Sequence, residues 1–359
     1  PQTMEITLSA GGTLSTLPVH LDGEPLLLGD WVGRDAPDFV LPNGGGFEYG
    51  HFHLDAGSRQ HLIETLPEIT DAKTRGIAWV TLWDAVLERE VAVGDWYALL
   101  LRGAVEEEDE QSLQRVLGYL GSTFWGYLSE DERAVQATST EEILWGQVEQ
   151  ATVTTRQSSY FNAWRNVVST PTGLARLHRI WEQVDSVGGM KFSVEDYTSM
   201  ATTLAILGEG DAEEILDRQF ERIENPDRRA RFLFVRPALS ADPAVREAFF
   251  EGLSDPENRA REPWVLAALG YLHHPTRTSH SQRFVIPSLE MVEEIQRTGD
   301  IFFPQRWLGS TLGSHNDPAL AADVKEWLDA LPDDYPHRLR GKILQSTDGL
   351  DRAARIGNP

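Results

Sequence analysis

Closely spaced histidines offer the first possible chemistry in this sequence. His51 and His53 stand two residues apart, and His61 follows soon after. Because alternate residues of a β-strand point to the same face, His51 and His53 could bind a metal ion as a pair. No Asp or Glu stands at a convincing third ligand position, and H-E-x-x-H does not occur. An exposed polar strand face explains the pair better, so we predict no metal ligands in this chain.

Motifs for nucleophilic or nucleotide chemistry are absent or incomplete. The sequence has no cysteine and no G-x-S-x-G, since Gly309-Ser310 lacks the framing glycines. Gly341-Lys342 lacks the leading glycine of a P-loop. His273 and His274 precede Pro275 at the expected end of a helix, where a histidine interacts favourably with the negative end of the helix dipole. We therefore predict no catalytic residue in this chain.

Arginines beside aromatic residues in the last hundred positions are the remaining candidates. Arg261 precedes Glu262-Pro263-Trp264, and Arg306 lies within the aromatic run 302–308. Arg338 and Arg340 follow on the expected last helix. Arginine recognises planar carboxylates well, so these four residues are candidate contacts for a peptide substrate. The alternative is that they form ion pairs between helices, for example through Glu262 or Asp300.

Charge is the strongest property of the composition. The 359 residues include 32 basic and 56 acidic ones, which gives a net charge of −24. Such an acidic surface repels phosphate backbones and anionic lipids, so we expect neither nucleic-acid nor membrane partners. No apolar run approaches the roughly 20 residues of a membrane-spanning helix. Without cysteines the compartment cannot be inferred, and because the sequence begins with Pro1 we expect it to be a piece of a longer protein.

The first 55 residues show the period of β-strands. Met4, Ile6 and Leu8 alternate with polar residues, and a second stretch covers 17–21. The clearest predicted hairpin joins 39–41 to a return strand at 47–54 through the turn 42–46, whose Asn-Gly and further glycines supply positive φ angles. In that return strand the residues of one face would be Phe47, Tyr49, His51 and His53.

After Asp55 the period changes to that of helices. Apolar stripes predict helices around 79–87, after a polar start at Thr70-Asp71, and around 116–124. Four further helix starts share one signal, an Asn or Asp cap followed by Pro in the first turn: Asn225-Pro226, Asp242-Pro243, Asp255-Pro256 and Asp317-Pro318. Short tandem helices bury their apolar faces by stacking as antiparallel pairs. The sequence thus predicts a mainly α protein: a small β-sandwich-like domain at 1–55, then an irregular, HEAT- or armadillo-like α-superhelix at 56–359.

Several segments resemble the aminopeptidase N-like zinc metallopeptidases (gluzincins). In that family a turn with Pro-Asn and Gly leads into an aromatic strand that ends in Asp, as in 41–55 here. The likeness continues at 66–71, 74–79, 261–264 and 296–304. The resemblance covers most of the chain and corresponds to the C-terminal half of the family, its β-domain and helical domain. These motifs are structural rather than catalytic.

The resemblance implies a function for the longer protein. The family's H-E-x-x-H, downstream Glu and G-x-M-E-N segment are absent here; Gly188-Gly189-Met190-Lys191-Phe192 lacks the glutamate and lies in the helical region. His51 and Leu54 also depart from the family pattern, which has Arg and Tyr there in many members. The resemblance therefore implies a non-catalytic piece that caps the active site of a zinc aminopeptidase and forms its peptide chamber. Zinc and catalysis would belong to an upstream domain, and this chain alone would be inactive. The alternative is a free-standing helical-repeat module that binds proteins.

Overall fold

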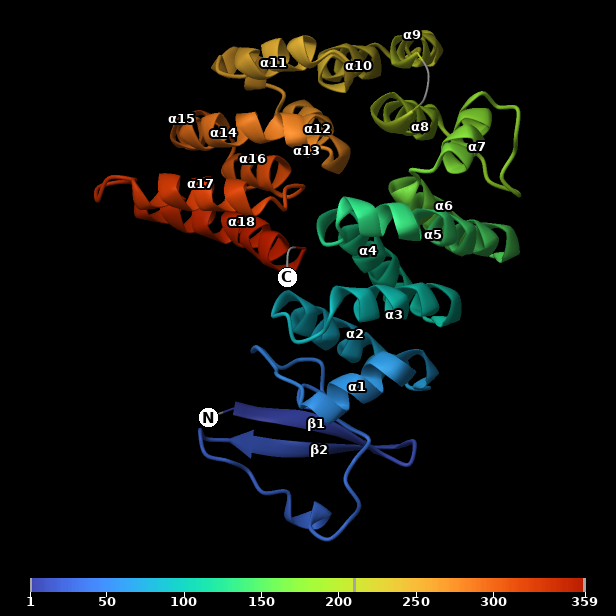
Figure 1. Ribbon diagram of the computed structural model, residues 1–359, viewed down its shortest axis with the longest axis vertical. Helices are drawn as coiled ribbons and strands as arrows, with labels where there is room; N and C mark the ends of the chain where they lie inside the picture. Colours follow the sequence, from blue (N-terminus) through green and yellow to red (C-terminus); the bar gives the residue numbers. More distant parts are fainter. Residues whose placement is uncertain (1, 209–210, 358–359) are drawn as a thin grey trace. The chain divides into compact units, whose positions relative to one another are not determined.

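The computed structural model describes residues 2–208 and 211–357, and it is mainly α-helical after a small antiparallel sheet (Figure 1). This confirms the predicted fold class. The chain forms two compact units, one ending at Thr123 and the other beginning at Phe124. The division into domains at 1–55 and 56–359 remains a prediction, and residues 1, 209, 210, 358 and 359 of those ranges lie outside the described residues.

A three-stranded sheet opens the first unit. Strand β1 (Gln2–Ala10) pairs with β2 (Thr13–Leu21) and with β3 (Phe39–Leu41), both antiparallel, in the order β2-β1-β3. Gly11 and Gly12 connect β1 to β2 with φ angles of 53° and 76°. A two-residue connection of this kind requires positive φ at both positions, which glycine adopts without strain. The pair of glycines therefore makes the hairpin, and the predicted strands 4–8 and 17–21 are its two arms.

The predicted hairpin between 39–41 and 47–54 is wrong. Residues 47–54 form no strand, and the side chains of Phe47 and Tyr49 are 95% and 96% exposed. The Glu48 carboxylate takes the place of a pairing strand, since its Oε1 accepts the backbone N–H of Glu5 in β1 at 3.0 Å. Gly44 packs so closely on Thr7 that a Cβ there would clash with the Thr7 backbone. Residues 44–48 thus contact β1 through the Glu48 side chain and through Gly44. They do not form a strand paired with β1, whereas β3 does.

Four longer helices complete the first unit. They are α1 (Ala56–Thr65), α2 (Ala72–Leu87), α3 (Val93–Glu106) and α4 (Glu110–Gly126), with short 3₁₀ turns η1 (Gly29–Trp31) and η2 (Leu66–Glu68). The predicted helices 79–87 and 116–124 are confirmed within α2 and α4. Asp71 caps α2 by accepting the N–H of Thr74 at 2.8 Å, which satisfies a donor that a helix start leaves unpaired. Trp79 and Trp96 are fully buried between these helices.

Helices and 3₁₀ turns are the regular elements of the second unit among its described residues, and loops connect them. Its elements are α5 (Glu130–Gln150), α6 (Thr154–Val167), α7 (Pro171–Trp181), α8 (Val194–Leu207), α9 (Ala212–Arg222), α10 (Pro226–Leu239), α11 (Pro243–Gly252), η3 (Pro256–Arg259), α12 (Glu262–Leu272), η4 (Pro275–Arg277), α13 (Thr278–Ser281), η5 (Gln282–Phe284), α14 (Val285–Glu290), α15 (Val292–Thr298), α16 (Phe303–Leu312), α17 (Pro318–Asp329) and α18 (His337–Ile356). Neighbouring helices pack in pairs, among them α5 with α6 and α8 with α9.

The four predicted Asn-Pro and Asp-Pro starts are confirmed. Asn225 caps α10, Asp242 caps α11 and Asp317 caps α17, and each side chain accepts a backbone N–H of the first turn. Asp255 does the same for the 3₁₀ turn η3 rather than for an α-helix. The signal was readable because cap and first turn are adjacent in sequence, so no distant contact decides the outcome.

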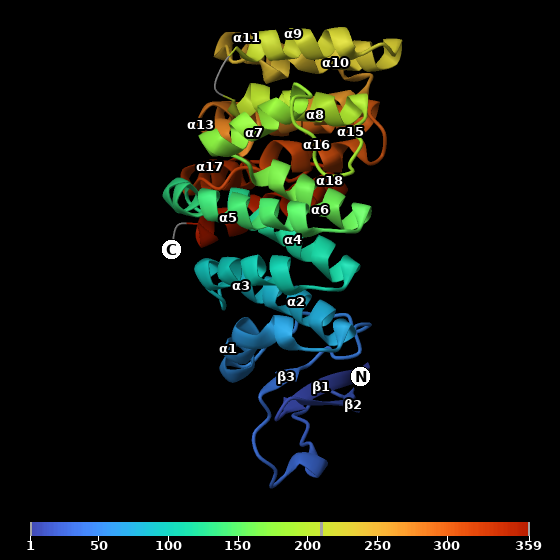
Figure 2. The ribbon, with the colours of Figure 1, turned by 90° about the vertical axis from the view of Figure 1, so that its right-hand side faces the viewer.

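Within the second unit the last helices return to its first residues (Figures 1 and 2). The side chain of Asn316, between α16 and α17, donates to the carbonyl of Gly126 at 3.4 Å. A large apolar core fills the part from α9 to α18, with Trp307 and Leu272 buried in it. Among the helices of the described residues, none combines the length and apolar character that a membrane crossing requires.

Candidate functional site

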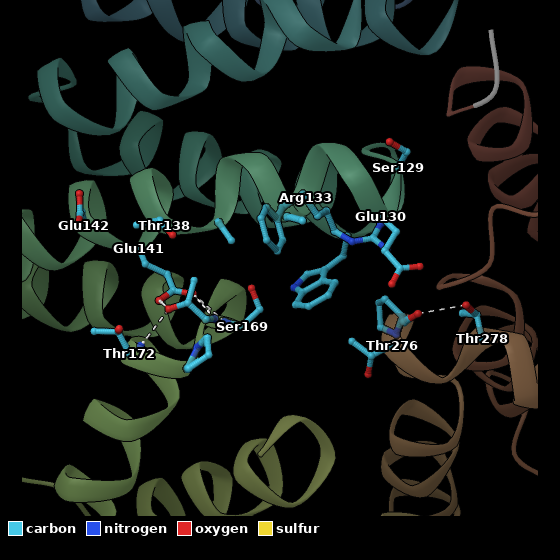
Figure 3. A pocket seen from close by; sticks show the side chains of 18 of the residues that line it. Ser129, Glu130, Arg133, Thr138, Glu141, Glu142, Ser169, Thr172, Thr276 and Thr278 are labelled. Atoms are coloured by element: carbon cyan, nitrogen blue, oxygen red, sulfur yellow. Dashed lines mark hydrogen bonds between the residues drawn. The ribbon is translucent and has the colours of Figure 1, made fainter. Parts of the chain in front are cut away.

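A pocket of about 940 Å³ lies in the second unit, where the end of α4 and the first half of α5 approach the turn η4 (Figure 3). Residues 169–176, which lead into α7, form another part of its wall, and Asn316 and Gly357 close it. Its volume is within the range of ligand-binding pockets. The surface it offers is mixed, with hydroxyls, carboxylates and guanidinium groups beside aromatic rings.

Glu141 holds the wall formed by α5 and the start of α7 (Figure 3). Its carboxylate is buried and accepts the backbone N–H groups of Ser169 at 2.7 Å and Thr170 at 2.8 Å. It also accepts the Thr170 hydroxyl at 2.6 Å, and that hydroxyl in turn caps α7 by accepting the N–H of Gly173. A side chain at Gly173 would collide with the carboxylate. The negative charge of Glu141 is therefore satisfied inside the protein and is not offered to a ligand.

Replacing Glu141 by alanine should destabilise the second unit by about 2–4 kcal/mol, because two buried N–H groups and a hydroxyl lose a charged acceptor. Glu142 is the matched control: it also lines the pocket but is exposed. Its replacement by alanine should change the free energy of unfolding by less than about 0.5 kcal/mol. Urea unfolding followed by circular dichroism measures both. Equal stability of the two variants would contradict this role of Glu141.

Trp125 is the centre of the opposite wall. Its Nε1 donates to the Asn166 carbonyl at 2.6 Å, which fixes the ring. The Arg133 guanidinium lies 5.8 Å from the ring centroid, and the His274 ring meets it edge-on at 5.2 Å. Burial lowers the pKa of His274 to about 4, so this imidazole is neutral near pH 7. Arg133 is thus the cation of this wall.

The histidine pair of the sequence analysis forms no ligand set. His53 Nδ1 contacts Glu90 Oε1 at 2.7 Å, and its ring packs edge-on against His51 with centroids 4.3 Å apart. Both side chains are exposed. The predicted strand 47–54, which would have placed them on one face, does not form. In the described part of the chain no group of three His, Cys, Asp or Glu side chains could hold a metal ion.

His273 ends α12 as predicted, but it is not a cation at the helix dipole. Its ring is completely buried, and its Nδ1 lies 2.9 Å from Nε2 of His315. Burial and the neighbouring His315 hold the pKa of His273 well below its usual value. Since the charged form would be buried without a counter-ion, His273 stays neutral and contributes a hydrogen bond instead of a charge–dipole interaction.

The four predicted arginines lie away from the pocket. Arg261 is exposed at the start of α12, 5.3 Å from the Trp264 ring, and Arg306 is exposed on α16, 6.0 Å from the Phe302 ring. Arg338 is exposed on α18, and Arg340 is partly buried with Nη2 3.4 Å from the Leu328 carbonyl. None of the four is among the residues that line the 940 Å³ pocket.

Two segments that carry the family resemblance do meet in space. Glu262 Oε1 accepts the backbone N–H of Asp300 at 2.7 Å, which joins the start of α12 to the turn before α16. Lys342 of α18 also reaches this region, where its Nζ donates to Gln296 Oε1 of α15 at 2.7 Å and to the Ile301 carbonyl of the turn at 3.3 Å. Glu262 therefore binds a backbone group, and the suggested ion pairing of the arginines through Glu262 or Asp300 is not how these side chains are used.

Sequence reasoning missed the buried polar residues. Glu107 lies in the acidic run 106–110, and its side chain is buried against Arg75. The signal available was Arg75 itself, an arginine on the apolar side of the predicted helix 79–87 and one turn before Trp79. Glu141 and Arg133 gave no signal, because each sits in a charged, ordinary-looking helix segment.

Comparison with known proteins gives one distant relation. No family model matches the chain. Aminopeptidase N from Streptomyces lividans is 24% identical over 232 residues, which are 64% of this chain and 27% of that protein. The match therefore spans about a quarter of the length of the relative. It supports a distant relation to aminopeptidase N.

Proposed function

We propose that this chain is the C-terminal, non-catalytic portion of a zinc aminopeptidase that removes N-terminal residues from peptides. The observation that carries this proposal is the alignment with aminopeptidase N, in which most of this chain corresponds to a small part of the relative. The fold supports it, because a small sheet followed by a long helical array is what the resemblance implied. The partners would be the catalytic domain of the same polypeptide and a peptide substrate.

The proposed function assigns the zinc ligands to the upstream catalytic domain and not to this chain. Three protein ligands from His, Cys, Asp or Glu are typical of a catalytic zinc site, and no such group occurs among the described residues. The metal would be held by the upstream domain, where zinc activates the attacking water and a glutamate acts as general base. The residues of this chain would act on the substrate only by shaping and lining the space around it.

The arginines Arg261, Arg306, Arg338 and Arg340 are the proposed contacts of the chamber. Their exposure and the aromatic neighbours of Arg261 and Arg306 support this role. A guanidinium group stacks on aromatic rings and is weakly hydrated, so it can face a peptide carboxylate or backbone at moderate cost.

A free-standing binding module is the second candidate, favoured by the presence of a pocket within the second unit itself. The two candidates differ in what accompanies this chain. The proposed function requires H-E-x-x-H in the reading frame upstream, and a start codon next to Pro1 would favour the binding module.

The chain alone should be folded and inactive. The test is incubation of the purified chain with zinc and a panel of aminoacyl p-nitroanilides, after circular dichroism has shown the helical spectrum. We expect no release of nitroaniline above the buffer control. Release that follows the chain through purification and stops with a chelator would contradict the non-catalytic role.

A further inference from the structure

Arg133 is partly buried and forms no ion pair among the described residues. The same lack of an ion pair is found at Arg246 and Arg277, which donate to backbone carbonyls. Unlike those two arginines, Arg133 lines the 940 Å³ pocket. Acidic residues outnumber basic ones by 56 to 32. Arg75 accordingly pairs with Glu107, Arg59 with Glu90 and Arg236 with Glu213. Arg133 is also partly buried, but no carboxylate of the described residues forms an ion pair with it; Glu130 and Glu132 of its own helix act on it only through space.

The guanidinium of Arg133 is held in place with donors to spare. Its Nη1 donates to the Leu128 carbonyl at 2.6 Å, and its Cζ lies 5.8 Å from the Trp125 ring centroid. Arginine has several further N–H donors in a flat fork that fits a carboxylate. Burial lowers the pKa of Arg133, yet an arginine remains protonated near pH 7. The pocket thus contains a fixed cation whose remaining donors are not paired with a protein carboxylate.

We propose that this pocket binds a carboxylate group of a peptide, with Arg133 as the residue that recognises it and Trp125 as the platform beneath the guanidinium. The choice of a peptide as ligand rests on the proposed function. The hydroxyls of Thr138 on α5 and Thr276 on η4 lie on different sides of the pocket and can meet a peptide backbone (Figure 3).

The other charges around the pocket limit the ligand class. The Glu141 carboxylate is buried and occupied by three hydrogen bonds, whereas Glu130 and Glu142 are exposed at the rim. Exposed charges are screened by salt, but they still disfavour a ligand of high negative charge such as a phosphate. Arg176 is a second guanidinium group in the lining, 4.4 Å from the Trp145 ring centroid. With Arg133 and Arg176 beside Glu130, Glu141 and Glu142, the pocket best suits a single carboxylate on an otherwise uncharged peptide.

The experiment measures binding by the whole chain, without catalysis. A fluorescein-labelled peptide of uncharged residues is titrated as the free acid and as the C-terminal amide, and binding is followed by anisotropy. We expect the free acid to bind at least about tenfold tighter than the amide. A third peptide, amidated but with one Asp side chain, tells whether a side-chain carboxylate is accepted as well as the terminal one.

Variants decide whether Arg133 is responsible. Arg133→Gln should bind free acid and amide equally. Arg297→Gln is the matched control, since it removes one positive charge from an exposed residue outside the pocket and should keep the preference. Thr138→Glu puts a carboxylate on the pocket wall at an exposed helix position and should abolish the preference even if Arg133→Gln fails to fold.

Equal binding of acid and amide by the unaltered chain would overturn the inference. So would a preference that survives in both Arg133→Gln and Thr138→Glu. Because these titrations need no upstream domain, their failure leaves the proposed aminopeptidase function untouched. Conversely, an intact preference would stand even if the reading frame proved to lack a catalytic domain.

Discussion

Replacing Arg75 by methionine should destabilise the first unit by about 3–5 kcal/mol, because it leaves the Glu107 carboxylate buried without its counter-charge. Arg75 Nη2 donates to Glu107 Oε1 at 2.6 Å, and Nε contacts both carboxylate oxygens at 3.1 Å. The same carboxylate accepts Trp79 Nε1 at 3.2 Å. Arg75 also donates from Nη1 to the Ile69 carbonyl at 2.6 Å, which ties the turn before α2 to that helix.

Hydrogen exchange separates this effect from changes in the second unit. In Arg75→Met, amides of α2 and α3 should exchange faster by a factor that corresponds to the lost stability, while those of α16 should stay unchanged. Lys73→Met is the matched control on the same helix. Lys73 is exposed, and its ion pair with Glu5 is long, with Nζ 4.0 Å from the carboxylate oxygen Oε2. The double variant Arg75→Met with Glu107→Leu should recover much of the loss, because both charges are then removed together. A single variant as stable as the control would show that this network is not needed.

The second unit should lose stability as the pH falls from about 6.5 toward 4. Burial lowers the pKa of His315 to about 4 in the folded state, from 6.5 when unfolded, although Asp317 acts in the opposite direction. Between these values the unfolded state binds more protons, so the free energy of unfolding decreases as the pH falls. For His315 alone the loss between pH 7 and about pH 4.5 is roughly 2–3 kcal/mol. The pKa of its partner His273 is lowered too, so it adds to the same trend.

Urea unfolding across this pH range measures the slope. His315→Asn should make the dependence on pH shallower by up to about 1.4 kcal/mol per pH unit, the effect of one proton. His337→Asn is the control, because His337 is exposed at the start of α18 and should leave the slope unchanged. Carboxylates also titrate at the lower end of this window, and the comparison with His337→Asn cancels their contribution. The same slope in both variants would contradict the assignment of the buried pair as the acid-sensitive element.

Local signals predicted the helices of this protein well. The caps Asp71, Asn225, Asp242 and Asp317 sit where the sequence placed them, since a cap and its first turn are neighbours in the chain. The prediction of a hairpin at 39–54 was wrong because the structure there depends on a residue distant in sequence. The backbone N–H of Glu5 donates to the Glu48 side chain and not to a neighbouring strand. The hairpin that does form joins β1 to β2 through Gly11 and Gly12, both with positive φ.

The candidate site could not be predicted from sequence for a similar reason. Arg133 is a candidate because it lines the pocket without an ion pair, and this depends on how α5 packs beside Trp125. His273 was recognised at a helix end, but its low pKa comes from burial and from His315, 42 residues further on, and neither is visible in the local sequence. The arginines beside aromatic residues were visible as motifs, and the structure shows Arg261 and Arg306 exposed beside those aromatics. Their contact with a substrate remains a prediction.

The most direct test of the proposed function is the aminopeptidase activity of the polypeptide translated from the full reading frame that contains this chain. Its hydrolysis of an aminoacyl p-nitroanilide is measured with and without a chelator, next to the chain alone at the same molar concentration. The proposal predicts turnover by the longer polypeptide, loss of turnover with the chelator, recovery with zinc, and none for this chain alone. A longer polypeptide without H-E-x-x-H and without chelator-sensitive turnover would contradict it.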